Sequence, residues 1–214
     1  MKGERIRVLL VDDHAVVREG YRRLLEKQEG IKVVGEAQDA ASAYQAYKET
    51  SPEVVVMDIS LPGRGGIDAL RHIRQWDANA RVLVFTMHTN VTYALQAFQA
   101  GAKGYVTKSS PPELLVTAVR EVAAGKLSIC PETSAALAAN RVGGEASAVE
   151  TLSPREFEIL RLLLEAKTTE EIAAAFNLSP KTVANYHYTI KSKLGVASDI
   201  ELVHYAIRQG LMGT

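Results

Sequence analysis

Residues 53–60 read EVVVMDIS, in which four consecutive apolar side chains, Val54–Met57, run directly into the carboxylate of Asp58. Because these apolar residues do not alternate with polar ones, the stretch predicts a strand that is buried on both faces. Such a strand fits a parallel sheet that is covered by helices on either side. The charge at its end needs an explanation, since burying a carboxylate costs free energy.

The same pattern recurs along the first half of the chain. Segments between the apolar runs, such as AVVREGYRRLLEK, place apolar residues at i, i+3, i+4 and i+7, which predicts helices. This alternation of strand and helix predicts a five-stranded, doubly wound parallel sheet of the α/β class, flavodoxin-like, over residues 1–125. The five predicted strands are 6–11, 31–37, 53–57, 81–85 and 104–107.

The second half of the chain has a different character. Residues 126–150 are rich in small residues, with a glycine pair at 143–144, and we interpret them as a linker in which 131–140 could form a short helix. Residues 151–214 predict a separate all-α domain of four helices. The residues expected to cap these helices are Ser153, Thr168 or Thr169, Ser179 and Ser198.

Composition limits the classes of function. The chain is 47% hydrophobic and 23% charged, and no apolar run approaches the roughly 20 residues that span a bilayer. The first residues do not resemble a secretory signal, and the single Cys130 offers no disulfide framework. We therefore expect a cytoplasmic protein without membrane contact. Because the formal net charge is zero, a nucleic-acid site would have to be local.

Functional groups are predicted to gather at one edge of the sheet. Asp12 and Asp13 follow the first strand as Asp58 follows the third, and the carboxyl ends of parallel strands share an edge. Clustered hard oxygen ligands suit Mg2+ better than zinc. Thr86 ends the fourth strand and Lys108 follows the fifth, so a hydroxyl and a cation join the acids. The combination predicts phosphoryl transfer to a carboxylate.

Each of these residues also has a purely structural explanation. Asp12 and Asp13 could cap the first helix, where carboxylates favour the positive end of the dipole. Lys108 could be a solvated loop lysine and Thr86 an ordinary hydroxyl at a strand end. The joint occurrence of five suitable groups at the ends of four predicted strands favours the functional interpretation.

Several motifs resemble a known family. The segments VDDHAVVREG (11–20), VMDISLPGRGGID (56–68), VLVFTMHT (82–89) and KGYVTKSS (103–110) resemble the receiver domain of two-component response regulators. Residues 152–196 resemble the LuxR-type helix-turn-helix of the NarL/FixJ subfamily. The resemblance covers essentially the whole chain.

The resemblance implies a role for each residue at the sheet edge. Asp58 would accept a phosphoryl group from the phosphohistidine of a sensor histidine kinase. Mg2+ would be held by Asp12, Asp13, Asp58 and the main-chain carbonyl of Ser60. Lys108 would contact the phosphoryl group, Thr86 would move to hydrogen-bond it, and Tyr105 would be the aromatic switch that turns inward. His14 also matches the subfamily, but we assign it no chemistry.

The candidate DNA site lies in the second domain. A helix-turn-helix inserts its second helix into the major groove, and residues 180–194 supply that helix. The segment 179–195 has three lysines and no acid, although 151–214 as a whole has seven basic and seven acidic residues. The candidate DNA contacts are Lys181, Thr182, Asn185, Tyr188, Lys191 and Lys193.

Two positions in this helix depart from the family pattern. Relatives commonly carry a lysine and, two residues later, a histidine where this chain has Ala184 and Tyr186. Because of this departure, the sequence does not identify the DNA operator that the helix would recognise. Tyr186 and Tyr188 could pack against the domain instead. Lys191 and Lys193 could be merely solvated.

The leading hypothesis is a response regulator that is not an enzyme, apart from slow autodephosphorylation. Phosphorylation at Asp58 would control homodimerisation and binding to double-stranded DNA. The last helix has an apolar face broader than a small domain requires. In the family this helix pairs with the same helix of a second copy. A closed core helix is the competing explanation. Two alternatives remain: a haloacid-dehalogenase-like phosphohydrolase, which normally has an acid where this chain has Ser60, and an adaptor that binds protein.

Overall fold

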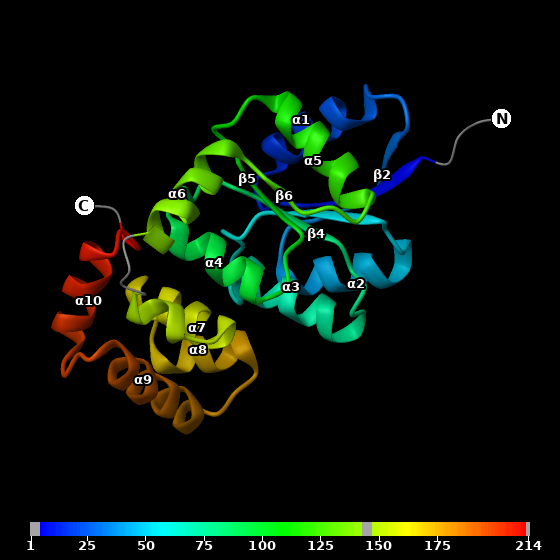
Figure 1. Ribbon diagram of the computed structural model, residues 1–214. Helices are drawn as coiled ribbons and strands as arrows, with labels where there is room; N and C mark the ends of the chain where they lie inside the picture. Colours follow the sequence, from blue (N-terminus) through cyan, green and yellow to red (C-terminus); the bar gives the residue numbers. More distant parts are fainter. Residues whose placement is uncertain (1–4, 143–146, 213–214) are drawn as a thin grey trace.

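The computed structural model describes residues 5–142 and 147–212 (Figure 1). The expectations for residues 1–4, for the glycine pair 143–144 and for the last two residues lie outside the described residues. Within the described ranges, no helix is both long enough and apolar enough to cross a bilayer.

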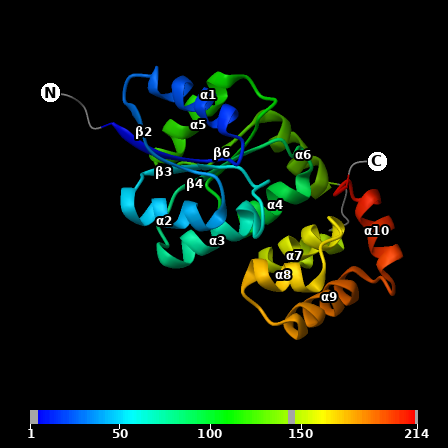
Figure 2. The same ribbon diagram turned by 180° about the vertical axis from the view of Figure 1, so that it is seen from behind.

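A parallel sheet of six strands forms the centre of the first domain, in the order β2-β1-β3-β4-β5-β6 (Figures 1 and 2). The order reverses beside β1, as in doubly wound folds, and this places β1 next to β3. The α/β fold is confirmed. The strands are β1 (Ile6–Val11), β2 (Ile31–Ala37), β3 (Val54–Met57), β4 (Val82–Thr86), β5 (Gly104–Thr107) and β6 (Ser128–Ile129).

The prediction of five strands was one short. β6 lies in the segment interpreted as a linker and pairs in parallel with β5. Ser128 N–H donates to Lys103 O at 3.1 Å, and Cys130 N–H donates to Tyr105 O at 3.0 Å. A strand of two residues is too short to produce a recognisable apolar pattern, so only the tertiary pairing reveals it.

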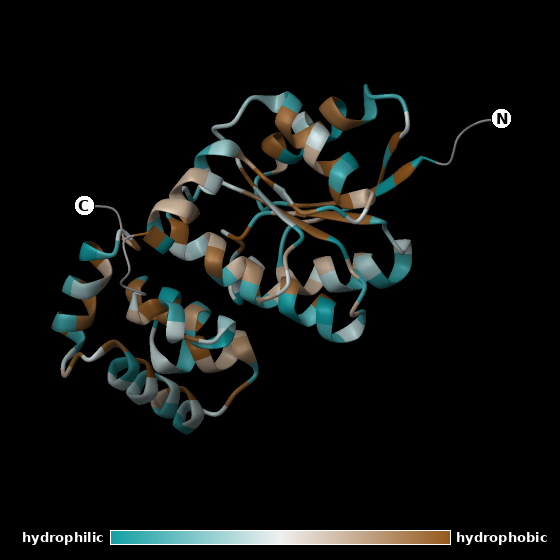
Figure 3. Cartoon of the chain, viewed as in Figure 1, coloured by the Kyte–Doolittle hydropathy of each residue, from teal (hydrophilic) through white to brown (hydrophobic). Residues whose placement is uncertain are grey.

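Helices cover both faces of the sheet (Figures 1 and 2). Helices α1 (Ala15–Glu26) and α5 (Pro112–Ala123) lie on one face; α2 (Ala40–Thr50), α3 (Gly65–Trp76) and α4 (Val91–Gln99) lie on the other. Alternate residues of one strand serve the two faces, since Val8 and Leu10 belong to one buried cluster and Leu9 and Val11 to the other. The buried strands explain the concentration of hydrophobic residues along the sheet in Figure 3.

The rest of the chain is helical. It contains α6 (Pro131–Val142), the 3-10 turn η1 (Ala148–Thr151), α7 (Pro154–Leu164), α8 (Thr169–Phe176), α9 (Pro180–Leu194) and α10 (Asp199–Arg208). The predicted caps at Ser153, Ser179 and Ser198 each accept a backbone N–H, and Thr168, not Thr169, caps α8. Asn177 ends α8 in the left-handed conformation, with φ 55°, and turns the chain toward α9.

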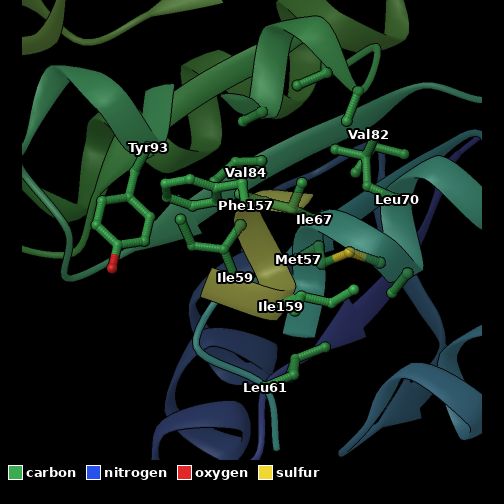
Figure 4. Packing of buried hydrophobic residues seen from close by; sticks show 14 of the residues in the cluster. Met57, Ile59, Leu61, Ile67, Leu70, Val82, Val84, Tyr93, Phe157 and Ile159 are labelled. Atoms are coloured by element: carbon green, nitrogen blue, oxygen red, sulfur yellow. The ribbon is translucent and has the colours of Figure 1, made fainter. Parts of the chain in front are cut away.

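The two domains are docked and share one hydrophobic cluster. Helix α7 packs against α3 and α4, and its buried Phe157 lies among receiver-side residues such as Ile59 and Val84 (Figure 4). The ring of Phe157 meets that of Tyr93 edge-on, with centroids 5.1 Å apart. The sequence left the relation of the domains open, because amphipathic patterns do not say which element covers an apolar face.

Candidate functional site

Neighbouring strands place two of the acidic side chains. β1 and β3 pair with Val11 opposite Met57, so Asp12 and Asp58 leave the sheet side by side. Asp58 N–H donates to Val11 O at 2.8 Å, and Asp12 N–H donates to Ala37 O at 3.0 Å. Both aspartates are buried, with 5% of Asp12 and 3% of Asp58 exposed. The structure therefore brings these two predicted residues together at the expected edge.

Lys108 joins the two carboxylates from the end of β5. Its Nζ lies 2.6 Å from Asp12 Oδ2 and 2.5 Å from Asp58 Oδ2. Burial disfavours the charged form of the lysine, but the hydrogen bonds and charges of the two aspartates outweigh it and raise the pKa of Lys108 above its ordinary value. The ammonium is therefore charged at neutral pH and lies within reach of any oxyanion attached to Asp58.

The oxygen set at this edge fits a divalent cation. Possible ligand atoms of Asp12, Asp13 and His14 all lie within 4.8 Å of one another. Asp13 Oδ1 is buried without a hydrogen bond among the described residues; His14 Nδ1 is 2.8 Å away but is not aligned to donate. An orphaned carboxylate oxygen is costly unless a cation or water satisfies it. Asp58 Oδ1 accepts the N–H of Ser60 at 2.9 Å, which folds the Ser60 backbone back toward the site.

Thr86 and Tyr105 both form hydrogen bonds with the backbone of His88, a residue that the sequence analysis did not single out. Thr86 is fully buried, and its Oγ1 accepts a long hydrogen bond of 3.4 Å from His88 N–H. The Tyr105 O–H donates to the carbonyl of His88 at 2.9 Å. Tyr105 thus already lies inward with no exposed surface, and its burial raises the pKa of its hydroxyl. His88 itself stacks on Tyr93 with ring centroids 3.9 Å apart, and burial lowers the pKa of its imidazole.

The candidate recognition helix α9 presents one face outward. Lys181, Asn185 and Tyr188 are exposed, and Thr182 is half-buried beside the cap Ser179. Tyr188 is 74% exposed, so it does not pack against its own domain, whereas Tyr186 is half-buried against the core. The structure therefore separates the two tyrosines.

The other two candidate lysines of α9 have partners within the domain. Lys191 Nζ lies 3.0 Å from Asp199, which also contacts His187 Nε2 at 2.8 Å. Lys193 Nζ lies 2.7 Å from the buried carboxylate of Glu156. Of the three lysines, Lys181 alone forms no ion pair within the described part of the chain, so the positive charge of the helix is freest at its N-terminal end.

Helix α10 divides its apolar side chains between two directions. Leu202 and Ala206 are buried against their own domain. Ile200, Val203 and Ile207 are spaced at helical intervals and are exposed by 72%, 36% and 40%. A closed core helix explains the first pair and not the second set.

Family models match both parts of the chain. Residues 8–120 match the response regulator receiver domain, and residues 150–206 match the bacterial regulatory proteins of the luxR family. Both descriptions are those of a regulator. They favour neither the phosphohydrolase nor the protein-binding adaptor.

Individual proteins extend the similarity to the full length. The response regulator UvrY of Escherichia coli is 41% identical over 208 residues, which are 96% of this chain and 95% of UvrY. A LuxR-family two-component response regulator from Aurantimonas has a crystal structure that is 55% identical, with a TM-score of 0.64 over 65% of this chain and 99% of that one. RcsB from Salmonella enterica, solved on promoter DNA with the phosphomimetic BeF3-, is 30% identical, with a TM-score of 0.75 over 94% of this chain and 98% of RcsB.

Proposed function

Since the chain belongs to the response regulators of two-component systems, with a receiver domain and a LuxR-type DNA-binding domain, we propose that Asp58 is its phosphoacceptor. The observation that carries the proposal is the position of Asp58 between Asp12 and the ammonium of Lys108. Our division of the chain is a receiver at 1–125, a connector at 126–150 and a DNA-binding domain at 151–214. Among the described residues of the connector, 128–129 form β6, 131–142 form α6, and η1 begins at Ala148.

The chemistry follows from the groups around Asp58. A carboxylate oxygen of Asp58 attacks the phosphorus of a phosphohistidine on the sensor kinase; the P–N bond breaks and an acyl phosphate forms. Asp12, Asp13, Asp58 and the carbonyl of Ser60 would hold Mg2+, which neutralises charge on the transferring group. Lys108 stabilises the same charge from the other side. Slow transfer of the phosphoryl group to water is the only turnover in this proposal.

Thr86 and Tyr105 respond to the new group through His88. A phosphoryl oxygen offers the Thr86 hydroxyl a charge-assisted hydrogen bond, which is stronger than the 3.4 Å contact with His88 N–H. The movement of Thr86 releases His88, whose carbonyl holds the Tyr105 hydroxyl. The loop before α4 can then settle into a second arrangement, with phosphorylation shifting the population between the two.

The output is DNA binding by a homodimer. The exposed side of α9 supports direct contact with DNA through Lys181, Thr182, Asn185 and Tyr188. Lys191 and Lys193 are proposed to contribute positive charge near the phosphates from within their ion pairs. The outward face of α10 supports pairing with the same face of a second copy, as for two half-sites on DNA. Such a regulator acts in the cytoplasm.

Labelling with acetyl phosphate tests the assignment of Asp58. We expect the wild type to incorporate one phosphoryl group and Asp58→Ala to incorporate none. Asp39→Ala serves as the control, because Asp39 caps α2 through Ser42 and does not contact the site. Labelling of Asp58→Ala to a similar stoichiometry would refute the assignment.

A further inference from the structure

Helix α3 begins without a cap of its own. The N–H groups of the first turn of a helix need acceptors from outside the helix. Arg64 occupies the cap position and its side chain makes no capping bond, while Asp68 in the first turn faces Arg71 instead. Gly66 N–H donates to Ile59 O at 3.0 Å within the receiver, but the acceptor for the next N–H comes from the other domain: Ile67 N–H donates to Glu158 Oε1 of helix α7 at 3.1 Å.

Two glycines allow this approach. Gly65 has φ +77°, and a Cβ there would lie 2.1 Å from Glu158 Oε2. A Cβ on Gly66 would lie 2.1 Å from the carbonyl oxygen of Asp58. The first turn of α3 is therefore pressed between the backbone of Asp58 on one side and the carboxylate of Glu158 on the other.

Opposing effects act on the charge of the Glu158 side chain. Glu158 is fully buried, and burial raises its pKa; the guanidinium of Arg161 at 2.7 Å and the Ile67 N–H act in the opposite direction. The positive end of the α3 dipole also stabilises a negative group. Glu158 thus has the environment of an N-cap residue, although it lies 91 residues further along the chain.

The chain between Asp58 and the first turn of α3 makes two further hydrogen bonds to the second domain. Arg161 donates to Gly63 O at 2.9 Å, and Arg64 donates to Ala175 O at 2.7 Å. Residues 59–67, which comprise the loop after Asp58 and the first turn of α3, are consequently held at three points by α7 and α8.

We propose that Glu158 is a positioning residue for the phosphoacceptor loop, capping α3 across the domain interface and so making domain docking and phosphorylation of Asp58 oppose one another. The inference rests on the proposed function of Asp58. Ser60 N–H occupies Asp58 Oδ1 at 2.9 Å, and the proposal requires this loop to adjust when a phosphoryl group and its cation bind, whereas the interdomain bonds hold it in place. By thermodynamic linkage, the factor by which docking weakens binding at Asp58 equals the factor by which binding at Asp58 weakens docking, so a variant that loosens docking should strengthen binding at Asp58.

The proposed DNA-binding and dimerisation surfaces of the second domain remain exposed when the domains are docked. Lys181, Asn185 and Tyr188 of α9 and the outward residues of α10 remain exposed in the docked arrangement. Docking therefore does not cover these surfaces. Docking must therefore act in one of two other ways. It can restrain the loop at Asp58, or it can limit the orientations that the second domain can take.

The cap is tested first by hydrogen exchange on the full-length protein without a phosphodonor. Loss of a hydrogen bond to a charged acceptor predicts roughly thirtyfold faster exchange of the Ile67 amide in Glu158→Ala. Glu158→Gln should give a smaller effect, because its amide oxygen can still accept. Glu156→Ala is the matched control: it lies on the same helix, but its partners Ser153 and Lys193 belong to the second domain. Unchanged exchange of Ile67 in Glu158→Ala would overturn the cap.

The coupling is tested by titrating the same variants with beryllofluoride in the presence of Mg2+, with bound fluoride followed by 19F NMR. We expect the half-saturating concentration to fall about fivefold in Glu158→Ala, less in Glu158→Gln and not at all in Glu156→Ala. Faster exchange of Ile67 with unchanged beryllofluoride affinity would make Glu158 merely structural and overturn the coupling. Absence of binding in the wild type would instead contradict the proposed function of Asp58 together with this coupling, while the exchange result would still decide the cap. Circular dichroism confirms that each variant is folded.

Discussion

Gly65→Ala should force Glu158 out of the domain interface. At φ +77° an alanine is strained by about 1 kcal/mol, and its Cβ would lie 2.1 Å from Glu158 Oε2. The carboxylate must move, which loses its hydrogen bond with Ile67 N–H, a bond to a charged acceptor that contributes ~2 kcal/mol. The total expected loss of unfolding free energy is about 3 kcal/mol.

A matched glycine separates the two contributions. Gly63 has a similar φ of +69°, but no atom lies within 4 Å of the position of its Cβ. Gly63→Ala should therefore cost only the backbone strain of about 1 kcal/mol. The difference between the two alanine variants measures the collision with Glu158.

The double variant gives the sharpest result. Glu158→Ala alone should cost ~2 kcal/mol, and it makes room for the Cβ at position 65. Gly65→Ala with Glu158→Ala should then cost about 3 kcal/mol rather than the sum of about 5 kcal/mol. Urea unfolding followed through the fluorescence of Trp76, the only tryptophan and the last residue of α3, measures each value. Additive losses of unfolding free energy in the double variant, or equal losses in Gly65→Ala and Gly63→Ala, would refute the placement of Glu158.

Other changes test the remaining parts of the site. Lys108→Met leaves two buried carboxylates unpaired and should cost ~3 kcal/mol of unfolding free energy in the same urea assay, partly restored by Mg2+; no loss would mean that the lysine is not their partner. Because the folded pKa of Lys108 is raised, its contribution is present at neutral pH and is lost as the pH rises through that pKa, so the wild-type and Lys108→Met stabilities should converge in alkali. Lys181→Ala should weaken DNA binding and reduce the salt slope by about one in a fluorescence anisotropy titration, and an unchanged slope would exclude a phosphate contact. Ile207→Asp should abolish dimerisation in analytical ultracentrifugation without altering the thermal unfolding of the monomer; a dimer that persists would exclude the outward face of α10.

The edge of the sheet was predictable because strand direction alone determines it. Once the runs that precede Asp12 and Asp58 are recognised as parallel strands, the two side chains must share an edge, and Lys108 joins them because it follows the fifth strand. The outward orientation of Tyr188 was not predictable, since one helical pattern fits both an exposed and a packed tyrosine. The partners of Lys191 and Lys193 depend on tertiary contacts with Asp199 and Glu156, which the local sequence does not specify.

Glu158 escaped prediction for a related reason. Its neighbour Glu156 fits a capping box with Ser153, so the acids of PREFE read as an ordinary helix start. Two local signs were nevertheless present: Glu158 stands between the apolar Phe157 and Ile159, and Arg161 follows at i+3. An acid within an apolar run that has a base one turn later indicates a buried pair, but the helix end that it serves appears only in three dimensions.

The paired charges at the domain interface contribute little to the stability of the docked arrangement. Burying paired charges gains little net free energy, because desolvation offsets their attraction. Arg155 shows the cost directly: its Nη1 is buried without a hydrogen bond among the described residues, 3.6 Å from Asp68 Oδ1. Burial lowers the pKa of this guanidinium, and the charge of Asp68 and the ring of Phe176, 4.5 Å from its Cζ, compensate in part. Because part of the cost at Arg155 is recovered when water reaches it, separation of the domains would offset part of the packing lost at Phe157.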